Sequence, residues 1–235
     1  MLLLALDTCD SRGSVALLAD TRVLAEISHP TVEEYSSWLL PAIDQLLSES
    51  HVSHSDLSGY AVASGPGSFT GVRVGLTTAK AWAEVYSKPI FPVSRLAVLA
   101  DHAHKNVQYA ATFIDAQRNQ IFAALHRRES GRWKLVGDEC VIEPIEFFKF
   151  TLDTVGSAPL SWISLDTELL AGSPFWHSQS SGDTSIIRVV PPLASAIGLH
   201  ALSHLLQQGT DALGLDANYV RRSDAEIFGK KAAGT

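Results

Sequence analysis

The amino-acid sequence predicts an α/β fold made of two similar lobes. In the first hundred residues, three strand patterns precede a helix, a strand, a second helix and another strand. In that order, the strands on either side of the second helix pair in parallel. A second series of strand patterns begins near Asp101 and echoes the first without a repeat at residue level. With 46% apolar and 18% charged residues in 235, the chain is predicted to be globular with a large core.

The first lobe is predicted to span residues 1–101. Its first strand is the apolar run Leu2–Leu6, with Ser14–Leu18 as hairpin partner and Arg22–Ser28 as third strand. Bulky residues at helical spacing predict a helix over 31–50: Tyr35, Leu39, Ile43, Leu46 and Leu47. The remaining elements are a strand at Tyr60–Ser64, a loop at Gly65–Gly71, a helix at Val72–Tyr86 and a strand at Pro89–Val93.

The second lobe is predicted to span residues 102–228, and 229–235 form a frayed tail. Its predicted elements are strands at Gln108–Asp115, Gln120–Arg127 and Trp133–Cys140, a short helix at Ile145–Lys149, a loop at Ser173–Asp183 and a helix at Leu193–Gln207. The pattern between the last two helices is weaker than in the first lobe.

Composition excludes several classes of protein. The apolar runs are too short for a membrane span, and the N-terminal segment lacks the basic region of a signal peptide. Only two cysteines are present, Cys9 and Cys140, so we expect a reducing, cytoplasmic location. The net charge of −7 makes the chain poorly suited to hold nucleic acid phosphates by itself.

Two segments of the first lobe can be interpreted as parts of a nucleotide site. The loop Gly65–Gly71 precedes a helix N-terminus, where free N–H groups bind phosphate, but no Walker lysine follows. Asp7 and Thr8 end the first strand, where a carboxylate can hold hydrated magnesium beside a phosphate. The alternatives are that the loop only sets its helix against a sheet or a partner, and that Asp7 caps a local turn.

The helix after the loop carries a stripe of small residues. Gly71, Gly75 and Ala79 recur every four residues, while Thr78 and Trp82 supply bulk beside them. Such a stripe allows another backbone to approach closely. The stripe faces either the sheet of its own lobe or a helix of a partner.

The histidines and potential nucleophiles give no support to a catalytic or metal site. His200 and His204 are one helical turn apart but have no third ligand nearby in sequence. His102 and His104 carry no motif. No serine lies in a Gly-x-Ser-x-Gly elbow, and neither cysteine has a catalytic context.

Taken together, several motifs resemble the TsaB (YeaZ) family. In the first lobe they are Ala5-Leu6-Asp7-Thr8, Ser14-Val15-Ala16-Leu17, Leu39-Leu40-Pro41-Ala42-Ile43, Ser64 to Gly75, Ala79-Lys80-Ala81 and Pro92-Val93-Ser94. Weaker ones follow at Asp115-Ala116-Gln117-Arg118 and Tyr219-Val220-Arg221. The chain departs from the family at Tyr35-Ser36-Ser37-Trp38, where His-Ser-Glu is common. It departs again at Val155-Gly156-Ser157-Ala158, which we align with the second-lobe glycine/aspartate loop and which has no acid.

The resemblance implies a fold and a function. The fold is that of the sugar-kinase/actin/heat-shock-chaperone (ASKHA) superfamily, with two ribonuclease-H-like lobes. The function is that of a non-catalytic activator and scaffold for TsaD, together with the ATPase TsaE. TsaD threonylcarbamoylates the tRNA adenosine beside the anticodon. No catalytic residue and no metal ligand are then expected in this chain.

The resemblance also implies partners and site residues. The two helices of the first lobe would dock on TsaD, or on a second copy of the chain when TsaD is absent, and tRNA would be bound only through the complex. The predicted contact residues are Tyr35, Leu39, Ile43, Gly71, Gly75, Thr78, Ala79 and Trp82. Asp7 and Thr8 would be a vestigial cofactor site. No cofactor is expected to bind tightly, and the resemblance leaves room for ATP or ADP at the interface with TsaD.

Two other functions are kept as alternatives. An ATP/Mg-dependent phosphotransferase of the same fold would use Asp7 as its magnesium anchor. A metal-dependent peptidase would require a bound metal ion.

Overall fold

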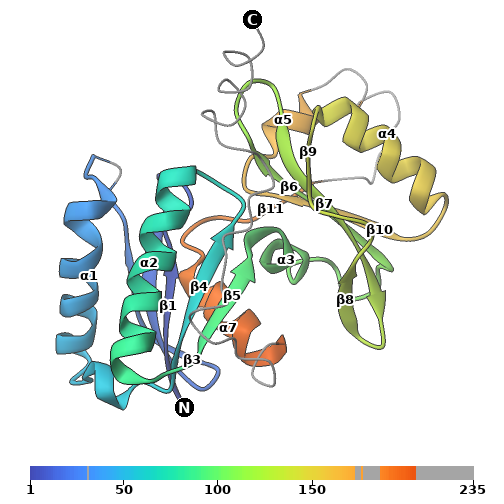
Figure 1. The fold of residues 1–235 in the computed structure, drawn as a ribbon. Helices are drawn as coiled ribbons and strands as arrows, with labels where there is room; N and C mark the ends of the chain where they lie inside the picture. The colour runs from blue at the N-terminus through green and yellow to red at the C-terminus, as the bar shows by residue number, and fades with distance from the viewer. Residues whose placement is uncertain (31, 173–175, 177–185, 205–235) are drawn as a thin grey trace, which may run out of the picture.

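The computed structural model describes residues 1–30, 32–172, 176 and 186–204, which form two lobes (Figure 1). The first lobe has a five-stranded sheet in the order β3-β2-β1-β4-β5. Its strands are β1 (Leu2–Asp7), β2 (Ser14–Ala19), β3 (Arg22–Ser28), β4 (Gly59–Gly65) and β5 (Ile90–Ser94). The first three pair antiparallel, and β4 and β5 are parallel to β1. All five predicted strands are therefore confirmed.

Helices α1 (Tyr35–Glu49) and α2 (Phe69–Tyr86) lie next to each other on one face of this sheet (Figure 1). A short 3-10 helix, η1 (His54–Asp56), follows α1. Helix α1 begins four residues later than predicted and runs through Pro41. Helix α2 begins three residues earlier than predicted, because the Ser68 side chain accepts a hydrogen bond from the Gly71 N–H and caps it.

Read from β8, the second sheet has the same strand order as the first: β8-β7-β6-β10-β11, with β6 in the place of β1 and β10 in the place of β4. Strand β9 pairs with β7 outside this order. Its strands are β6 (Tyr109–Asp115), β7 (Ile121–Glu129), β8 (Arg132–Leu135), β9 (Cys140–Ile142), β10 (Leu160–Ser164) and β11 (Ile186–Arg188). The predicted strand Trp133–Cys140 is in fact two strands, β8 and β9, separated by a bend that contains Gly137 at φ +75°. Helix α4 (Pro144–Val155) is longer than the predicted Ile145–Lys149, and α5 (Glu168–Ala171) was not predicted. The shared strand order confirms the two-lobed α/β fold.

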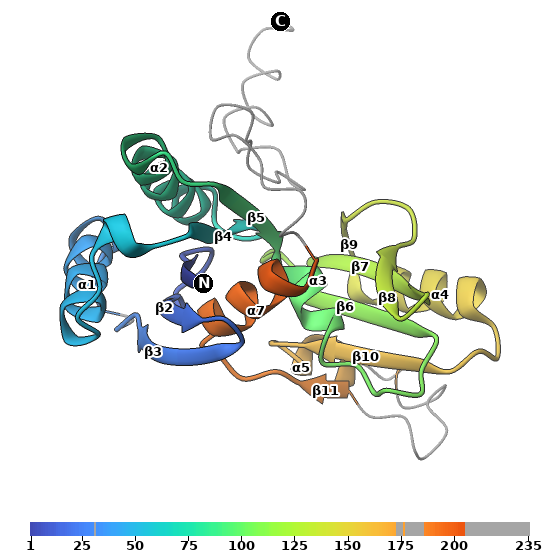
Figure 2. The same ribbon diagram turned by 90° about the horizontal axis from the view of Figure 1, so that it is seen from below.

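Helix α7 (Ala194–His204) belongs to the first lobe, which corrects the prediction that residues 102–228 all lie in the second. A Cβ on Gly198 would meet Leu18 and Ala5, whereas Gly75 of α2 faces Val62. Ala5 and Val62 point to opposite faces, because Val62 is in register with Leu6. The first sheet is therefore covered by α1 and α2 on one face and by α7 on the other (Figure 2).

The core is shared between the lobes. Helix α3 (Arg95–Ala100) lies at their junction, and the main cluster of buried apolar residues extends from the first sheet into Ile114, Phe122 and Ile163 of the second. A second cluster lies under α4, where Trp162 packs against Phe148 with ring centroids 5.1 Å apart. The predicted loop at Ser173–Asp183 is described only at Trp176, and the predicted tail lies outside the described residues.

Candidate functional site: the turn after β1 and the two-helix surface

The turn after β1 brings together groups from several elements. Asp7 is fully buried; its Oδ1 accepts a hydrogen bond from the Cys9 N–H at 3.0 Å, and its Oδ2 lies 3.2 Å from Arg95 Nε. Arg95, at the start of α3, also donates to Asp10 Oδ2 at 2.8 Å. Thr8 Oγ1 donates to the carbonyl of Gly71 at 2.6 Å, which fixes the turn to the N-terminus of α2.

Burial and charge pairing shift the pKa values of the two aspartates of this turn in opposite directions. Burial raises the pKa of Asp7, against the opposing effect of the Arg95 guanidinium. Burial also acts to raise the pKa of Asp10, but Arg95 and Arg12 outweigh it and hold the pKa of Asp10 well below its usual range. Asp10 is therefore an anion held between two guanidinium groups.

These residues do not fit a magnesium nucleotide at the turn after β1. A hydrated magnesium ion needs an accessible carboxylate oxygen, and Asp7 Oδ2 is buried and faces Arg95. The Thr8 hydroxyl is already bonded to Gly71. A guanidinium thus stands where the predicted cofactor site required a metal cation.

The second lobe has an acid at the position equivalent to the glycine loop, which corrects the alignment with Val155–Ala158. Because β10 occupies the place of β4 in the shared strand order, the equivalent loop is Leu165–Thr167, and Val155–Ala158 instead ends α4. This loop contains Asp166. Asp166 Oδ2 accepts the Asp115 N–H at 3.0 Å, and Oδ1 pairs with Arg12 at 2.6 Å. Asp166 could not be recognised from the sequence, because no clear strand pattern marks β10 before it.

The small-residue stripe of α2 faces its own lobe. Gly71, Gly75 and Ala79 are buried, and a Cβ on Gly71 would lie 2.1 Å from the Thr8 carbonyl oxygen. The structure therefore favours the alternative that the stripe packs on its own lobe, and contact of these three residues with a partner stays a prediction. Leu39 and Ile43 of α1 are buried in the same core, and their contact with a partner likewise stays a prediction.

The other predicted contact residues lie partly at the surface. Tyr35 is half-buried, accepts a hydrogen bond from the Gly13 N–H at 2.9 Å and donates to the Asp10 carbonyl. Trp82 is half-buried against His54, with ring centroids 4.4 Å apart. Thr78 is half-buried on the outer side of α2, next to Val74. Their role as partner contacts stays a prediction.

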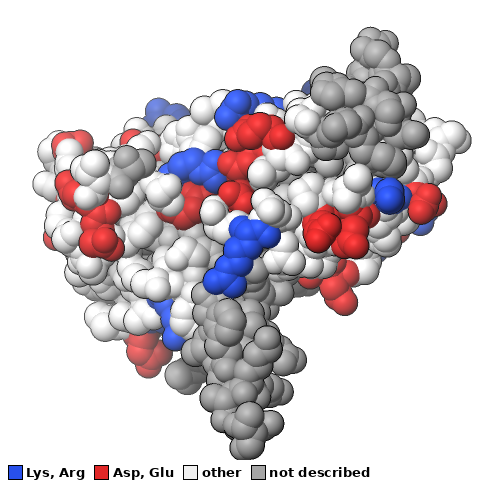
Figure 3. Space-filling view, turned by 90° about the horizontal axis from the view of Figure 1, so that it is seen from above, with Lys and Arg blue, Asp and Glu red and all other residues white. Residues whose placement is uncertain are grey.

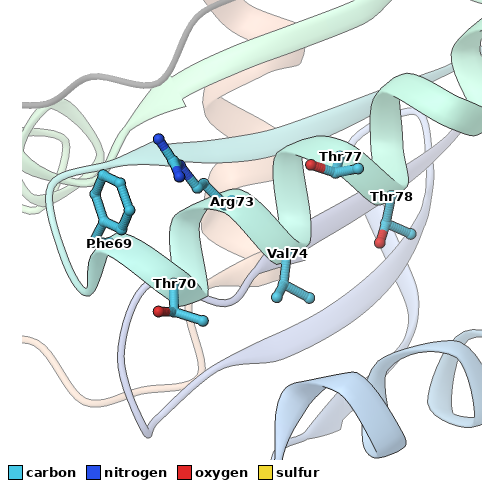
Figure 4. Close-up of a pocket in the computed structure, with 6 residues that line it drawn as sticks. All are labelled: Phe69, Thr70, Arg73, Val74, Thr77 and Thr78. Atoms are coloured by element: carbon cyan, nitrogen blue, oxygen red, sulfur yellow. The ribbon is translucent and has the colours of Figure 1, made fainter.

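The outward face of α2 forms a shallow groove of about 440 Å³. Its lining residues are Phe69, Thr70, Arg73, Val74, Thr77 and Thr78 (Figure 4). Thr70, Val74 and Thr78 point toward the side where α1 lies, while Phe69 and Arg73 point the other way (Figure 4). The Arg73 guanidinium lies 3.7 Å from the Phe69 ring centroid. We call this groove, with the neighbouring outer side of α1, the two-helix surface.

The histidines form no metal site within the part of the chain that the structure describes. His200 Nδ1 lies 2.7 Å from Asp101 Oδ2, and His102 Nδ1 lies 3.1 Å from the Val98 carbonyl oxygen. His204 ends α7, and its side chain is outside the described residues. Among the described helices, none has the length and apolar character needed to cross a bilayer.

His126 on β7 is a buried histidine that belongs to no motif in the sequence. Burial lowers the pKa of His126 to about 4 from 6.5. Because the unfolded chain takes up this proton first, we expect the free energy of unfolding to fall by about 3 kcal/mol between pH 6.5 and pH 4. His126→Leu should flatten this dependence in urea titrations. The exposed His104→Gln should leave it unchanged, and a His126→Leu profile as steep as that of wild type would contradict the assignment.

Comparison with known proteins gives a consistent result. A family profile described as "TsaD: tRNA N6-adenosine threonylcarbamoyltransferase" matches residues 22–217. The chain is 36% identical over 131 residues to Bacillus subtilis "tRNA threonylcarbamoyladenosine biosynthesis protein TsaB", covering 56% of this chain and 57% of that protein. It is 35% identical over 147 residues to the Escherichia coli protein of the same description, covering 61% and 63%. The matched region therefore spans about 57–63% of the length of these curated relatives.

Two solved structures match over nearly the whole chain. YeaZ from Pseudomonas aeruginosa is 26% identical with a TM-score of 0.68, and covers 91% of this chain and 96% of its own. An uncharacterised protein described as similar to the peptidase YeaZ from that organism is 25% identical with a TM-score of 0.72, and covers 94% and 99%. Together with the shared strand order of the two sheets, these matches confirm the ASKHA-type fold.

Proposed function

The chain belongs to the TsaB/YeaZ family, and the TsaD family profile also matches it over residues 22–217. We propose that it is a non-catalytic subunit that docks on TsaD and activates it. TsaE joins the pair in this proposal. The complex threonylcarbamoylates the tRNA adenosine next to the anticodon in the cytoplasm.

The observation that carries the proposal is the two-helix surface. Its groove is lined by residues of a single helix, and Phe69 is 37% exposed there. On α1, the neighbouring helix, Leu40 is 50% exposed. Exposed apolar side chains on adjacent helices are typical of a surface that buries area against a partner. This surface therefore replaces the buried glycine stripe as the proposed contact with TsaD.

Activation is proposed to work by differential binding. Docking stabilises the productive form of TsaD only if the two-helix surface binds that form more tightly than other forms. When TsaD is absent, the same surface is proposed to bind a second copy of the chain. Self-association and docking on TsaD then compete.

The nucleotide and the tRNA are assigned to the complex. We propose that ATP or ADP is held at the interface with TsaD and that this chain holds no nucleotide in its own cleft, since Arg95 occupies the place of a metal cation beside Asp7. The net charge of −7 supports tRNA binding mainly by the partner. The alternative phosphotransferase needs a free carboxylate at Asp7, and the pairing with Arg95 argues against it.

The decisive experiment is reconstitution. Threonylcarbamoylation of tRNA is measured with TsaD and TsaE, with and without this chain. Strong stimulation that depends on the chain supports the proposal. Full activity without the chain contradicts it. Calorimetry of the isolated chain with ATP and magnesium tests the alternative, for which micromolar affinity lost in Asp7→Ala is expected.

Thr78→Glu is expected to weaken binding to TsaD at least tenfold, because a carboxylate at this half-buried position would lose water when the groove is covered. The measurement is the dissociation constant for TsaD by biolayer interferometry, together with the thermal midpoint of the variant. The matched control is Thr154→Glu on the exposed side of α4. Equal affinity of the two variants for TsaD would exclude the groove as the contact.

A further inference from the structure

Arg12 makes an ion pair between the two lobes, which also share a buried core and the Ser94–Glu139 hydrogen bond. Arg12 lies in the turn after β1, and its Nη1 donates to Asp166 Oδ1 of the second lobe at 2.6 Å. A second bond, from Nη2 to Asp166 Oδ2, measures 3.4 Å. Two contacts between one guanidinium and one carboxylate fix direction as well as distance.

Both partners of this ion pair are anchored in their own lobe. On the first-lobe side, Arg12 Nη2 donates to Asp10 Oδ2 at 2.7 Å, and Asp10 also accepts from Arg95. On the second-lobe side, Asp166 accepts the Asp115 N–H, which fixes it to the end of β6. Ser164 Oγ accepts the Asp166 N–H at 2.9 Å and donates to the Phe113 carbonyl at 2.7 Å.

The result is a chain of alternating charges from the tip of β1 to the tip of β10: Asp7, Arg95, Asp10, Arg12 and Asp166. We call it the ion-pair chain. Seen from above, acidic and basic side chains meet in the middle of the molecule (Figure 3). The ion-pair chain is buried at Arg95, whose side chain is 1% exposed, and partly open to solvent at Arg12, whose side chain is 32% exposed.

We propose that the ion-pair chain is a built-in strap that holds the two lobes at a fixed angle without a bound ligand. Clefts between domains are common ligand sites, and a ligand that contacts both walls closes them. Here, Arg12 and Asp166 make a direct contact between the two lobes, of the kind that such a ligand would otherwise make. The inference does not rest on the proposed function, because it concerns the isolated chain.

The strap also touches the elements that carry the two-helix surface. In the turn that contains Asp10 and Arg12, the Asp10 carbonyl accepts a hydrogen bond from the Tyr35 hydroxyl at the start of α1. The Cys9 carbonyl of the same turn accepts one from the Ser68 N–H before α2, at 2.6 Å. A change in lobe angle therefore acts on the same turn that positions both helices. This arrangement makes the strap a means by which the second lobe can influence the first.

The test is the distribution of distances between the lobes of the isolated full chain. Spin labels at Ser48→Cys and Thr154→Cys, in a Cys140→Ser background, report this distance by pulsed electron resonance. We expect one narrow distribution for the wild type. Arg12→Gln and Asp166→Asn should each broaden it, and the double variant should be no broader than either single variant, because all three lack the same contact.

Two controls separate the strap from a general loss of charge. Arg12→Lys keeps a cation within reach and should recover much of the narrow distribution. Arg188→Gln removes an exposed arginine whose 3.8 Å ion pair with Glu168 stays within the second lobe, and should change nothing. If Arg12→Gln fails to fold, 1 M salt on the wild type should broaden the distribution by screening the partly exposed pair.

Two outcomes would overturn the inference. One is a distribution in Arg12→Gln and Asp166→Asn that is as narrow as that of wild type. The other is narrowing of the wild-type distribution when magnesium and ATP are added, since the strap would then not replace a ligand.

Discussion

Gly71→Ala is expected to lower the free energy of unfolding by about 3 kcal/mol, a large effect for the addition of one methyl group. Its Cβ would lie 2.1 Å from the carbonyl oxygen of Thr8, which is backbone and cannot turn away. The Thr8 hydroxyl bond to the Gly71 carbonyl holds the two segments together at this point. The measurement is urea unfolding followed by circular dichroism.

Two matched variants distinguish this clash from a general effect on α2. Gly75→Ala should cost less, because its Cβ would meet the Thr8 Oγ1 side-chain atom at 2.5 Å and a helix favours alanine over glycine. Thr77→Ala, on the exposed side, should stay within about 0.5 kcal/mol of wild type. If Gly71→Ala were as stable as Thr77→Ala, this would contradict the close contact between Thr8 and Gly71.

Arg95→Ala is expected to destabilise the fold by about 3–5 kcal/mol, because it leaves the buried carboxylate of Asp7 without its counter-charge. Asp7 is 0% exposed, and Arg95 is the cation paired with its Oδ2. The loss should be larger at pH 7 than at pH 4, since protonation of Asp7 removes the unpaired charge. Thermal and urea unfolding at both pH values measure it.

Removing both charges should cost less than removing one. In Asp7→Asn with Arg95→Met, no buried carboxylate is left unpaired at that position, so the double variant should be more stable than Arg95→Ala alone. Arg22→Ala, an exposed arginine of β3, is the control and should have little effect. A double variant less stable than Arg95→Ala would show that the ion pair is not the source of the loss.

The element order of the first lobe could be predicted because each strand and helix there carries its own pattern. Leu2–Leu6 is apolar throughout, and the core-facing residues of α1 recur at helical spacing. Such signals are local and need no knowledge of the neighbours. The second sheet was harder to predict, since β10 and β11 are only five and three residues long and show little pattern of their own.

The direction in which a residue faces could not be predicted. The spacing of Gly71 and Gly75 fits contact with a partner helix as well as contact with the turn after β1 of the same chain. Only the position of Thr8 in the structure decides between the two. The ion pair between Arg12 and Asp166 joins residues 154 positions apart and follows no spacing rule. The lobe to which α7 belongs was missed for the same reason, because helix periodicity does not say which sheet the apolar face covers.

The position of α7 has a consequence for the order in which the protein can fold during synthesis. Proteins emerge from the ribosome N-terminus first, and domains generally fold as they emerge. One face of the first sheet is covered by residues 194–204, so this lobe stays incomplete until almost all of the described chain has been made. Until then, Ala5 and Leu18 lack their α7 contacts. The first lobe therefore begins to be translated before the second lobe, but it is the later of the two to be completed.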